Sequence, residues 1–151
     1  MTLEHEMTYR LKTRGPLGTT EGSPIGARQY WEMSEATLTG PRINAKLGMP
    51  GGDWMVYGLD GFGRPSVRMQ FLTDDNALIL LNYTGLVERS PAFTAAADAG
   101  RETAWSDQYM RMTMTFDCGA ERYHWLNQHL FLAKGRLAGP NAIEYEVYRL
   151  T

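Results

Sequence analysis

The sequence predicts an all-β protein: an antiparallel β-barrel, closed or nearly closed, of about eight to nine strands with one short helix. Segments that alternate between apolar and polar residues recur along the chain, which is typical of half-buried antiparallel strands. Glycine and proline separate these segments, and only one segment carries the signals of a helix. A closed barrel leaves no exposed sheet edge. A two-sheet sandwich fits the same alternation and is the competing architecture.

The clearest strand covers residues 107–117 (DQYMRMTMTFD), where methionines alternate with polar residues. Successive side chains of a strand point to opposite faces, so its methionines share one face while its arginine and threonines share the other. The other expected strands cover residues 6–13, 28–39, 42–47, 53–59, 65–73, 76–84, 128–134 and 142–150.

The expected helix covers residues 91–99. Ser90 is a suitable N-cap, Pro91 occupies the first helical position and Gly100 follows the end. Phe93 begins a short apolar stripe at helical spacing. These signals interrupt an otherwise all-β chain.

Length and composition indicate one globular domain over residues 1–151. The chain has 43% hydrophobic and 21% charged residues, which is ordinary for a globular protein. Its net charge of −2 gives no electrostatic reason to expect nucleic acid or an anionic membrane as a partner.

No cofactor or metal is expected. Residues 58–65 (GLDGFGRP) are predicted to form a hairpin turn, because they lack the dinucleotide fingerprint and no helix follows. A single cysteine, Cys118, cannot build a zinc cluster, and His5, His124 and His129 do not have a familiar ligand spacing. The first residues lack the apolar run of a signal peptide, so a cytoplasmic location is expected.

Two sets of alternating side chains compete for the inside of the barrel. The methionine-rich set comprises Met69, Phe71, Leu78, Leu80, Met110, Met112 and Met114. The mixed set comprises Arg68, Gln70, Ile79, Tyr83, Tyr109, Arg111 and Thr113. The first set would make a solid core, whereas the second would line an amphipathic pocket for a small molecule. We expect the mixed set to face inward, which leaves the methionines beneath the helix or at a subunit interface. This arrangement predicts a small hydrophobic or aromatic ligand and a homo-oligomer, a dimer.

Four stretches resemble the motifs of a bacterial family known as domain of unknown function 3237, in the same order from about residue 25 onward. They are PGGDW at 50–54, TDDNALI at 73–79, YMRMTMTFDCGAERYHWLN at 109–127 and EYEVYRL at 144–150. The resemblance implies a barrel of the allene oxide cyclase and dirigent type. Such barrels include cyclases that act on small molecules without a cofactor, and proteins that only bind, so the fold alone does not assign an activity.

The resemblance also marks individual positions. The matching residues are Gly51, Gly52, Asp53, Trp54, Arg68, Thr73, Asp74, Asp75, Tyr109, Arg111, Tyr123, Trp125 and Asn127. Many relatives carry an extra alanine in the GGDW stretch, so the reach of Asp53 differs from theirs by one residue. Gln128 and His129 also depart from the family pattern, so a role for His129 would be particular to this chain.

Asp53 and Trp54 stand side by side in a predicted turn, and two interpretations are open. Asp53 either caps backbone amides in the turn or lies at the barrel rim as a general acid or base. In the second case the Trp54 ring excludes water, raises the pKa of the Asp53 carboxyl and helps to bind the substrate.

The arginines and tyrosines of the mixed set have similar alternatives. A buried guanidinium needs a carboxylate or an oxyanion, so Arg111 either forms an internal salt bridge or stabilises a charged substrate oxygen. Arg68 has the same alternatives and is a candidate for substrate binding. Tyr83 and Tyr109 either donate hydrogen bonds to a carbonyl or enolate oxygen or only pack.

Residues 122–129 (RYHWLNQH) supply the last candidates. In a strand, Tyr123, Trp125 and Asn127 would share one face and could form a wall that orients a ligand. Alternatively, Trp125 fills the barrel end and Asn127 satisfies backbone groups. His129 is either a general base or a histidine with a structural hydrogen bond.

Together these observations predict a cofactor-independent enzyme that acts in the barrel lumen on a small, largely apolar carbonyl or hydroxyl compound, aromatic or enone-like. Proton transfer with oxyanion stabilisation fits an isomerase, a cyclase, a hydratase or a retro-aldol lyase. The alternative is a non-catalytic, lipocalin-like binding protein. A third possibility is an assembly protein with a solid barrel.

Overall fold

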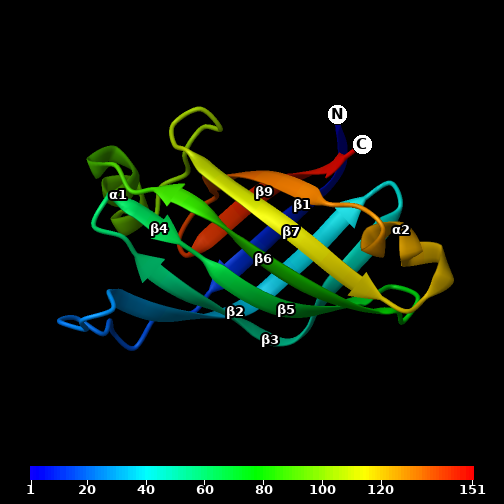
Figure 1. Ribbon diagram of the computed structural model, residues 1–151, viewed down its shortest axis with the longest axis horizontal. Helices are drawn as coiled ribbons and strands as arrows, with labels where there is room; N and C mark the ends of the chain where they lie inside the picture. The colour runs from blue at the N-terminus through cyan, green and yellow to red at the C-terminus, as the bar shows by residue number, and fades with distance from the viewer.

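The computed structural model covers residues 1–151 and shows a closed antiparallel β-barrel of eight strands with one extra strand (Figure 1). The strands are β1 (Leu3–Thr13), β2 (Ala27–Gly40), β3 (Ile43–Tyr57), β4 (Phe62–Arg64), β5 (Ser66–Thr73), β6 (Leu78–Glu88), β7 (Met110–Cys118), β8 (Phe131–Leu137) and β9 (Ala142–Leu150). The barrel runs β1-β2-β3-β5-β6-β7-β8-β9 and closes between β9 and β1, while β4 pairs with β3 and β6. The predicted barrel is therefore confirmed, and the sandwich is excluded.

Three short helical segments connect the strands. They are α1 (Pro91–Asp98), the 3-10 turn η1 (Glu121–Tyr123) and α2 (His124–Asn127). Helix α1 follows β6 at one end of the barrel, and α2 follows β7 at the opposite end (Figure 1). We refer to them as the α1 end and the α2 end. No helix is long and apolar enough to cross a bilayer.

Helix α1 forms as its sequence predicts, ending one residue earlier. The Ser90 hydroxyl accepts a hydrogen bond from the Phe93 amide at 3.1 Å, and Pro91 occupies the first turn. Phe93 and Ala96 are the buried residues of the helix, while Gly100 follows it with a φ of 63°. The helix is thus fixed by its cap and by the burial of Phe93 and Ala96 in the core.

Residues 122–129 do not form the strand that would place Tyr123, Trp125 and Asn127 on one face, because most of this segment is helical. Tyr123 and Leu126 are buried and lie three residues apart, which is the spacing of one helix face. Asn127 accepts a hydrogen bond from the Cys118 amide and donates one to the Cys118 carbonyl, both at 2.8 Å. Asn127 therefore satisfies backbone groups at the end of β7, as the second interpretation of this segment proposed.

The PGGDW stretch is not a turn, because β3 continues through it. The predicted strands 42–47 and 53–59 belong to this one strand, which pairs with β2 and β5. The pairing with β5 shifts register between Met49 and Gly52. A bulge of this kind admits extra residues without ending the strand. In GLDGFGRP, the turn is followed by the short strand β4.

Apolar side chains fill most of the barrel. Along β7, Met110, Met112 and Met114 have 1% exposure each, and the residues between them are exposed. They belong to one core of 30 buried residues, which also includes Met69 and Phe71 of β5. The methionines of the first set therefore face inward and are not available for a subunit interface.

The expectation that the mixed set lines the lumen is wrong for most of its members. Arg68, Gln70, Tyr109, Arg111 and Thr113 are exposed, whereas Ile79 and Tyr83 are buried. Leu78 and Leu80 of the methionine-rich set are exposed. The physical reason is the high free-energy cost of removing a guanidinium from water, which an apolar thioether does not incur.

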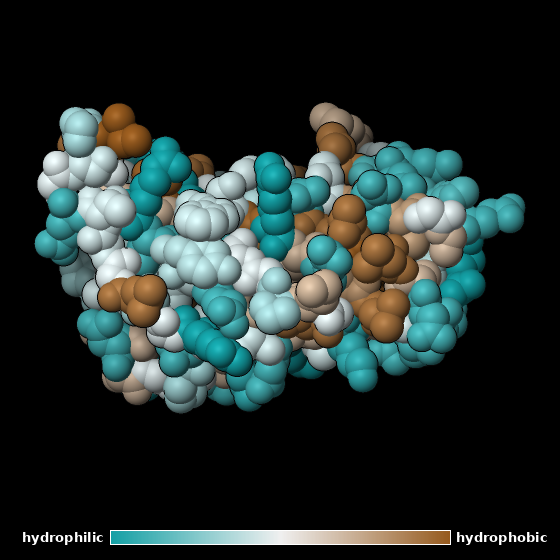
Figure 2. Space-filling model, turned by 90° about the horizontal axis from the view of Figure 1, so that it is seen from below, coloured by the Kyte–Doolittle hydropathy of each residue, from teal (hydrophilic) through white to brown (hydrophobic).

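The outer surface is mixed in character. Polar side chains cover most of the face in Figure 2, and apolar side chains gather in a patch on it. Exposed apolar residues on β3, β5 and β6 include Met49, Leu72, Leu78 and Leu80. The protein thus has a largely apolar interior with some apolar residues left at the surface.

Gly135 of β8 offers a test of this packing. A Cβ atom there would lie 2.3 Å from the Met110 sulfur and 2.5 Å from Cε1 of Tyr145. We expect Gly135→Ala to lower the free energy of unfolding by about 1–3 kcal/mol through overpacking, measured by urea denaturation. Gly119→Ala is the matched control, because nothing lies within 4 Å of its Cβ position. Equal effects of the two substitutions would contradict the packing described here.

Candidate functional site

The double glycine of β3 lets the chain pass close to its neighbours. A Cβ atom on Gly51 would lie 2.6 Å from the Arg68 carbonyl oxygen, and one on Gly52 would lie 2.2 Å from the Tyr30 ring. Any larger residue at either position would force the strands or the ring to move. The glycines therefore permit a close approach of β3 to β5 on one side and to Tyr30 on the other.

Because side chains alternate along a strand, Asp53 and Trp54 point to opposite faces. Asp53 is 6% exposed and pairs with Val67 of β5, whereas Trp54 is 60% exposed and packs against Tyr30 with 4.5 Å between ring centroids. The interpretation that Trp54 shields Asp53 from water is therefore wrong. Asp53 lies inside the barrel wall and Trp54 lies outside it.

Burial changes the acidity of Asp53. Removal from water raises the pKa of its carboxyl from 3.8 to about 6, even though the hydrogen bond from the Ser66 amide to Oδ1, 2.9 Å long, lowers it. A carboxyl group with a pKa near 6 exchanges its proton close to neutral pH. This property suits a general acid or base.

Three buried tyrosines lie near Asp53. The ring centroid of Tyr9 is 5.5 Å from that of Tyr145 and 5.9 Å from that of Tyr83. The ring centroids of Tyr83 and Tyr145 are 6.1 Å apart. The Tyr9 hydroxyl donates to the Met69 sulfur at 2.7 Å and lies 3.3 Å from the Tyr83 hydroxyl. We call Asp53, Tyr9, Tyr83 and Tyr145 the interior cluster.

The environment keeps these phenols protonated. Burial raises the pKa of each of the three phenols, Tyr9, Tyr83 and Tyr145, above the ordinary value for tyrosine. The negative charge of Asp53 raises each pKa further. Their hydroxyl groups are therefore hydrogen-bond donors throughout the physiological pH range. The interior cluster thus combines one group that can take up a proton with three that can stabilise a charged oxygen.

Two polar atoms of the interior cluster have no hydrogen-bond partner. They are Oδ2 of Asp53 and the hydroxyl oxygen of Tyr145. Neither atom is completely buried from solvent. One acceptor and one donor are thus left available inside the barrel, where polar groups are normally paired.

Gln108 adds a third unpaired atom near Tyr145. Its side-chain amide donates hydrogen bonds to the carbonyl of Ala104 at 3.0 Å and to the carbonyl of Gly135 at 3.2 Å. Gly135 of β8 stands directly opposite Tyr145 of β9. Since both partners are acceptors, the orientation of this amide group is fixed. Its Oε1 is fully buried without a partner.

The structure places Arg111 and Tyr109 away from the interior cluster. Arg111 is exposed, donates to the Met110 carbonyl at 3.0 Å and lies 5.1 Å from the Tyr109 ring centre. Tyr109 is 46% exposed. Of the predicted catalytic residues, only Asp53 and Tyr83 are brought together.

Four further predicted residues, Tyr123, Trp125, Asn127 and His129, lie at the α2 end. His129 contacts the Trp125 carbonyl through Nδ1 at 2.8 Å and an Arg149 nitrogen through Nε2 at 3.2 Å. The Tyr123 hydroxyl donates to Asp75 at 3.1 Å. These contacts hold α2 against the barrel, and they do not bring His129, Tyr123 or Trp125 to Asp53.

Tyr123 and Trp125 also border a hollow of about 470 Å³ at this end. The Arg42 guanidinium covers the Trp125 ring at 3.8 Å, and Asp75 forms an ion pair with Arg122. Two of the charged residues that line this hollow, Asp75 and Arg122, therefore neutralise each other.

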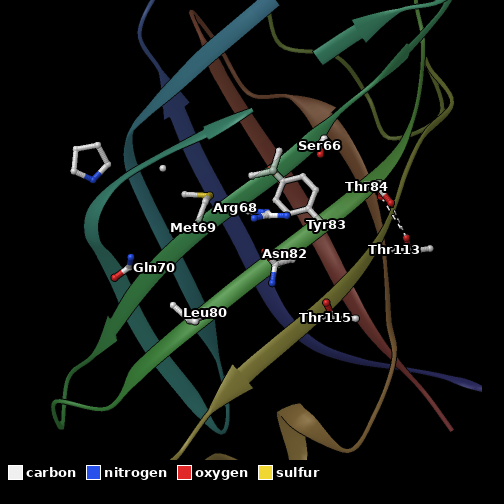
Figure 3. Close-up of a pocket in the computed structure, with 13 residues that line it drawn as sticks. Ser66, Arg68, Met69, Gln70, Leu80, Asn82, Tyr83, Thr84, Thr113 and Thr115 are labelled. Atoms are coloured by element: carbon white, nitrogen blue, oxygen red, sulfur yellow. Dashed lines mark hydrogen bonds between the residues drawn. The ribbon is translucent and has the colours of Figure 1, made fainter. Parts of the chain in front are cut away.

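A larger groove of about 720 Å³ lies against β5, β6 and β7, and it includes Arg68 (Figure 3). Its lining consists of Pro50, Gly51, Ser66, Val67, Arg68, Met69, Gln70, Leu80, Asn82, Tyr83, Thr84, Thr113 and Thr115. We call it the outer groove. It meets the interior cluster at Tyr83, and Ser66 and Val67 at its border are also the contacts of Asp53.

No three histidine, cysteine, aspartate or glutamate side chains are grouped so that they could hold a metal ion. The polar groups available to a ligand are therefore those of the interior cluster and of the outer groove.

Sequence reasoning missed Tyr9 and Tyr145. Both alternate with polar residues in β1 and β9, and they stand opposite each other in the pairing of those strands. The signal in the sequence was a tyrosine at an inward position of each strand. Their proximity to Asp53 depends on barrel closure, which alternation does not specify.

Comparisons with known proteins agree with this barrel. The sequence profile of a family described as protein of unknown function (DUF3237) matches residues 1–150. A UPF0311 protein of Clostridium acetobutylicum is 24% identical over 133 residues, which are 87% of this chain and 84% of that protein.

Two solved structures extend the comparison. A conserved protein of unknown function from Rhodopseudomonas palustris is similar with a TM-score of 0.86 and 18% identity, over 100% of this chain and 99% of the other. An enzyme from Penicillium herquei is similar with a TM-score of 0.71 and 18% identity, over 99% and 94% of the two chains. At this identity the likeness shows a shared fold.

The raised pKa of Asp53 predicts a dependence of stability on pH. Below about pH 4 the carboxyl is protonated in both the folded and the unfolded chain, and the stability that the raised pKa contributes is lost as the pH rises to about 6. Asp53→Asn removes the buried charge, so we expect it to stabilise the protein by up to about 3 kcal/mol at pH 8 and much less at pH 4. Urea denaturation at both pH values measures the difference.

Asp74→Asn is the control, because Asp74 is exposed. A stability difference for Asp53→Asn that is the same at pH 4 and pH 8 would show that Asp53 does not carry a buried charge.

Proposed function

The chain belongs to the DUF3237 family of proteins of unknown function, and we propose that it is a cofactor-independent enzyme that transfers a proton in a small carbonyl or hydroxyl compound. The observation that carries the proposal is the buried Asp53 carboxyl, whose pKa is raised to about 6 beside three tyrosines that remain protonated. Perturbed titratable groups of this kind concentrate at catalytic sites.

In the proposed reaction, Asp53 is the general base. Its Oδ2 has no partner in the protein and removes a proton from a carbon next to the substrate carbonyl, or from a substrate hydroxyl. The negative charge that develops on the substrate oxygen is stabilised by a phenol of the interior cluster. The Tyr145 hydroxyl suits this role best, because it has no partner to give up.

The surroundings of Asp53 favour a largely apolar substrate. Aromatic rings and methionine side chains form the wall near Asp53, with Tyr83 and Met69 among them. An aromatic or enone-like compound matches such a wall through apolar and ring contacts. Isomerisation, cyclisation, retro-aldol cleavage and dehydration, the reverse direction of a hydratase, can each begin with this proton transfer, so each is compatible with the proposed site.

The proposal replaces the oxyanion-stabilising residue expected from the sequence. Arg111 lies on the outer face, so the proposal assigns that task to tyrosines. The enzyme from Penicillium herquei with the same fold supports the compatibility of this barrel with catalysis. Its fold does not specify the reaction of the present chain.

A dimer remains a prediction, and the proposed chemistry does not require one. The methionine interface that motivated it does not exist, since those side chains form the core. Exposed apolar residues such as Leu78 and Leu80 are the surface that a partner subunit would cover.

The proposed proton transfer can be tested without knowledge of the final product. A panel of aryl ketones and cyclic enones is incubated with the protein in D2O, and deuterium incorporation next to the carbonyl is followed by NMR. We expect incorporation to accelerate as the pH rises through about 6 and then to level off, because Asp53 acts in its ionised form. Asp53→Asn should slow it at least about 100-fold.

Asp74→Asn serves as the control and should exchange deuterium at the wild-type rate, because Asp74 is an exposed turn residue. Tyr145→Phe should slow the exchange while leaving its pH midpoint near 6. If Asp53→Asn exchanges deuterium as fast as the wild type, the proposed enzyme is wrong. Identification of a retained small molecule by mass spectrometry would then favour the binding protein.

A further inference from the structure

The outer groove is a second place where the protein could hold a ligand; it shares Tyr83 with the interior cluster, but its polar side chains take no part in the proposed reaction. Its volume of about 720 Å³ is in the range of small-molecule sites. Three neighbouring strands form its floor, so its side chains are held in fixed rows by the pairing of β5 with β6 and of β6 with β7.

Two of these rows carry the polar side chains of the groove. In the first row, Arg68 stands opposite Asn82, which stands opposite Thr115. In the second row, Ser66, Thr84 and Thr113 follow one another in the same way, and the last two hydroxyls lie 3.4 Å apart. Residues opposite each other on one face are close enough to contact one ligand group together.

Arg68 is the only charged residue that lines the groove. Figure 3 shows it near the centre of the lining residues, between Tyr83 and Asn82. It forms no ion pair, although arginines elsewhere on this barrel, such as Arg10 and Arg136, are paired with Glu144. Glu32, in the same row through Gly52, is paired with Arg14, and Asp117, opposite Leu80, forms no ion pair with Arg68.

We propose that the outer groove binds a small organic carboxylate, with the Arg68 guanidinium as its charged anchor. One unpaired cation among neutral hydroxyl and amide groups matches a ligand with a single negative charge. The planar guanidinium can donate two parallel hydrogen bonds to a carboxylate, and a lysine could not reproduce this geometry. Asn82 and Thr115 stand in the same row and complete the polar contacts.

A carboxylate could also come from an acidic side chain of a second copy of this chain. We favour the free compound, because the groove volume suits a small molecule and the hydroxyl and amide groups of the two rows stand beside Arg68. The experiment below distinguishes the two sources.

Benzoate and benzamide are the probes, because they have the same shape and differ in charge. Titration of each into isotope-labelled full-length protein is followed by NMR chemical shifts. We expect benzoate to shift the amide signals of β5 and β6 and to bind at least ten times more tightly than benzamide. Arg68→Gln should weaken benzoate binding at least tenfold and leave benzamide binding unchanged.

Arg111→Gln is the matched control. Arg111 is also an exposed arginine without an ion pair and belongs to β7, which contributes to the groove, but Arg111 itself does not line the groove. This variant should bind benzoate like the wild type. Asp117→Asn should strengthen benzoate binding, because it removes a negative charge that repels the ligand from the β7 side of the groove.

The outcomes separate this proposal from the proposed reaction. Asp53→Asn should bind benzoate normally, so loss of proton transfer and loss of the groove site are independent results. Equal binding of benzoate to Arg68→Gln, Arg111→Gln and the wild type would overturn the proposal. It would also be overturned if benzoate does not bind and Arg68→Gln dissociates an oligomer in analytical ultracentrifugation, since the groove would then be an interface between copies.

Discussion

The closed hydrogen-bonded ladder is the constraint on which the rest of this structure depends. Each of the eight barrel strands is paired on both sides, so no strand can rotate about its axis without breaking two sets of hydrogen bonds. The side of the wall on which a residue lies is therefore fixed by its position in the strand. Asp53 lies inside and Trp54 outside for this reason alone, and the chemistry of both follows from it.

The register of strand pairing also determines which tyrosines lie next to each other inside the barrel. Tyr9 and Tyr145 stand opposite each other in neighbouring strands, and the absence of a side chain on Gly135 leaves room for the Tyr145 ring. The polar atoms of the interior cluster are thus held by apolar packing around them. A site held in this way keeps its geometry when a substrate binds, because the surrounding core resists deformation.

Much of the fold could be predicted from the sequence, because its signals are local. The cap at Ser90 and the alternation along β7 each depend on a few neighbouring residues. The segment that forms β6 was harder, since apolar residues occupy both faces of LILLNY and alternation cannot choose between them. A shift by one residue exchanges the faces, which is why Tyr83 was grouped with Arg68. The interior cluster could not be predicted, because its members come from four strands that only closure brings together.

The position of the charged residues follows from a difference between carboxylates and guanidinium groups. A buried aspartate can reduce the cost of leaving water by taking up a proton, and the raised pKa of Asp53 expresses this. An arginine cannot lose its proton in a protein, so a lone arginine inside the barrel would keep its full charge there. Arg68 and Arg111 are accordingly turned outward, although the alternate residues of both strands face into the core. The one charged group that this barrel can enclose without a partner is therefore a carboxyl, and a carboxyl that exchanges its proton near pH 6 is suited to proton transfer.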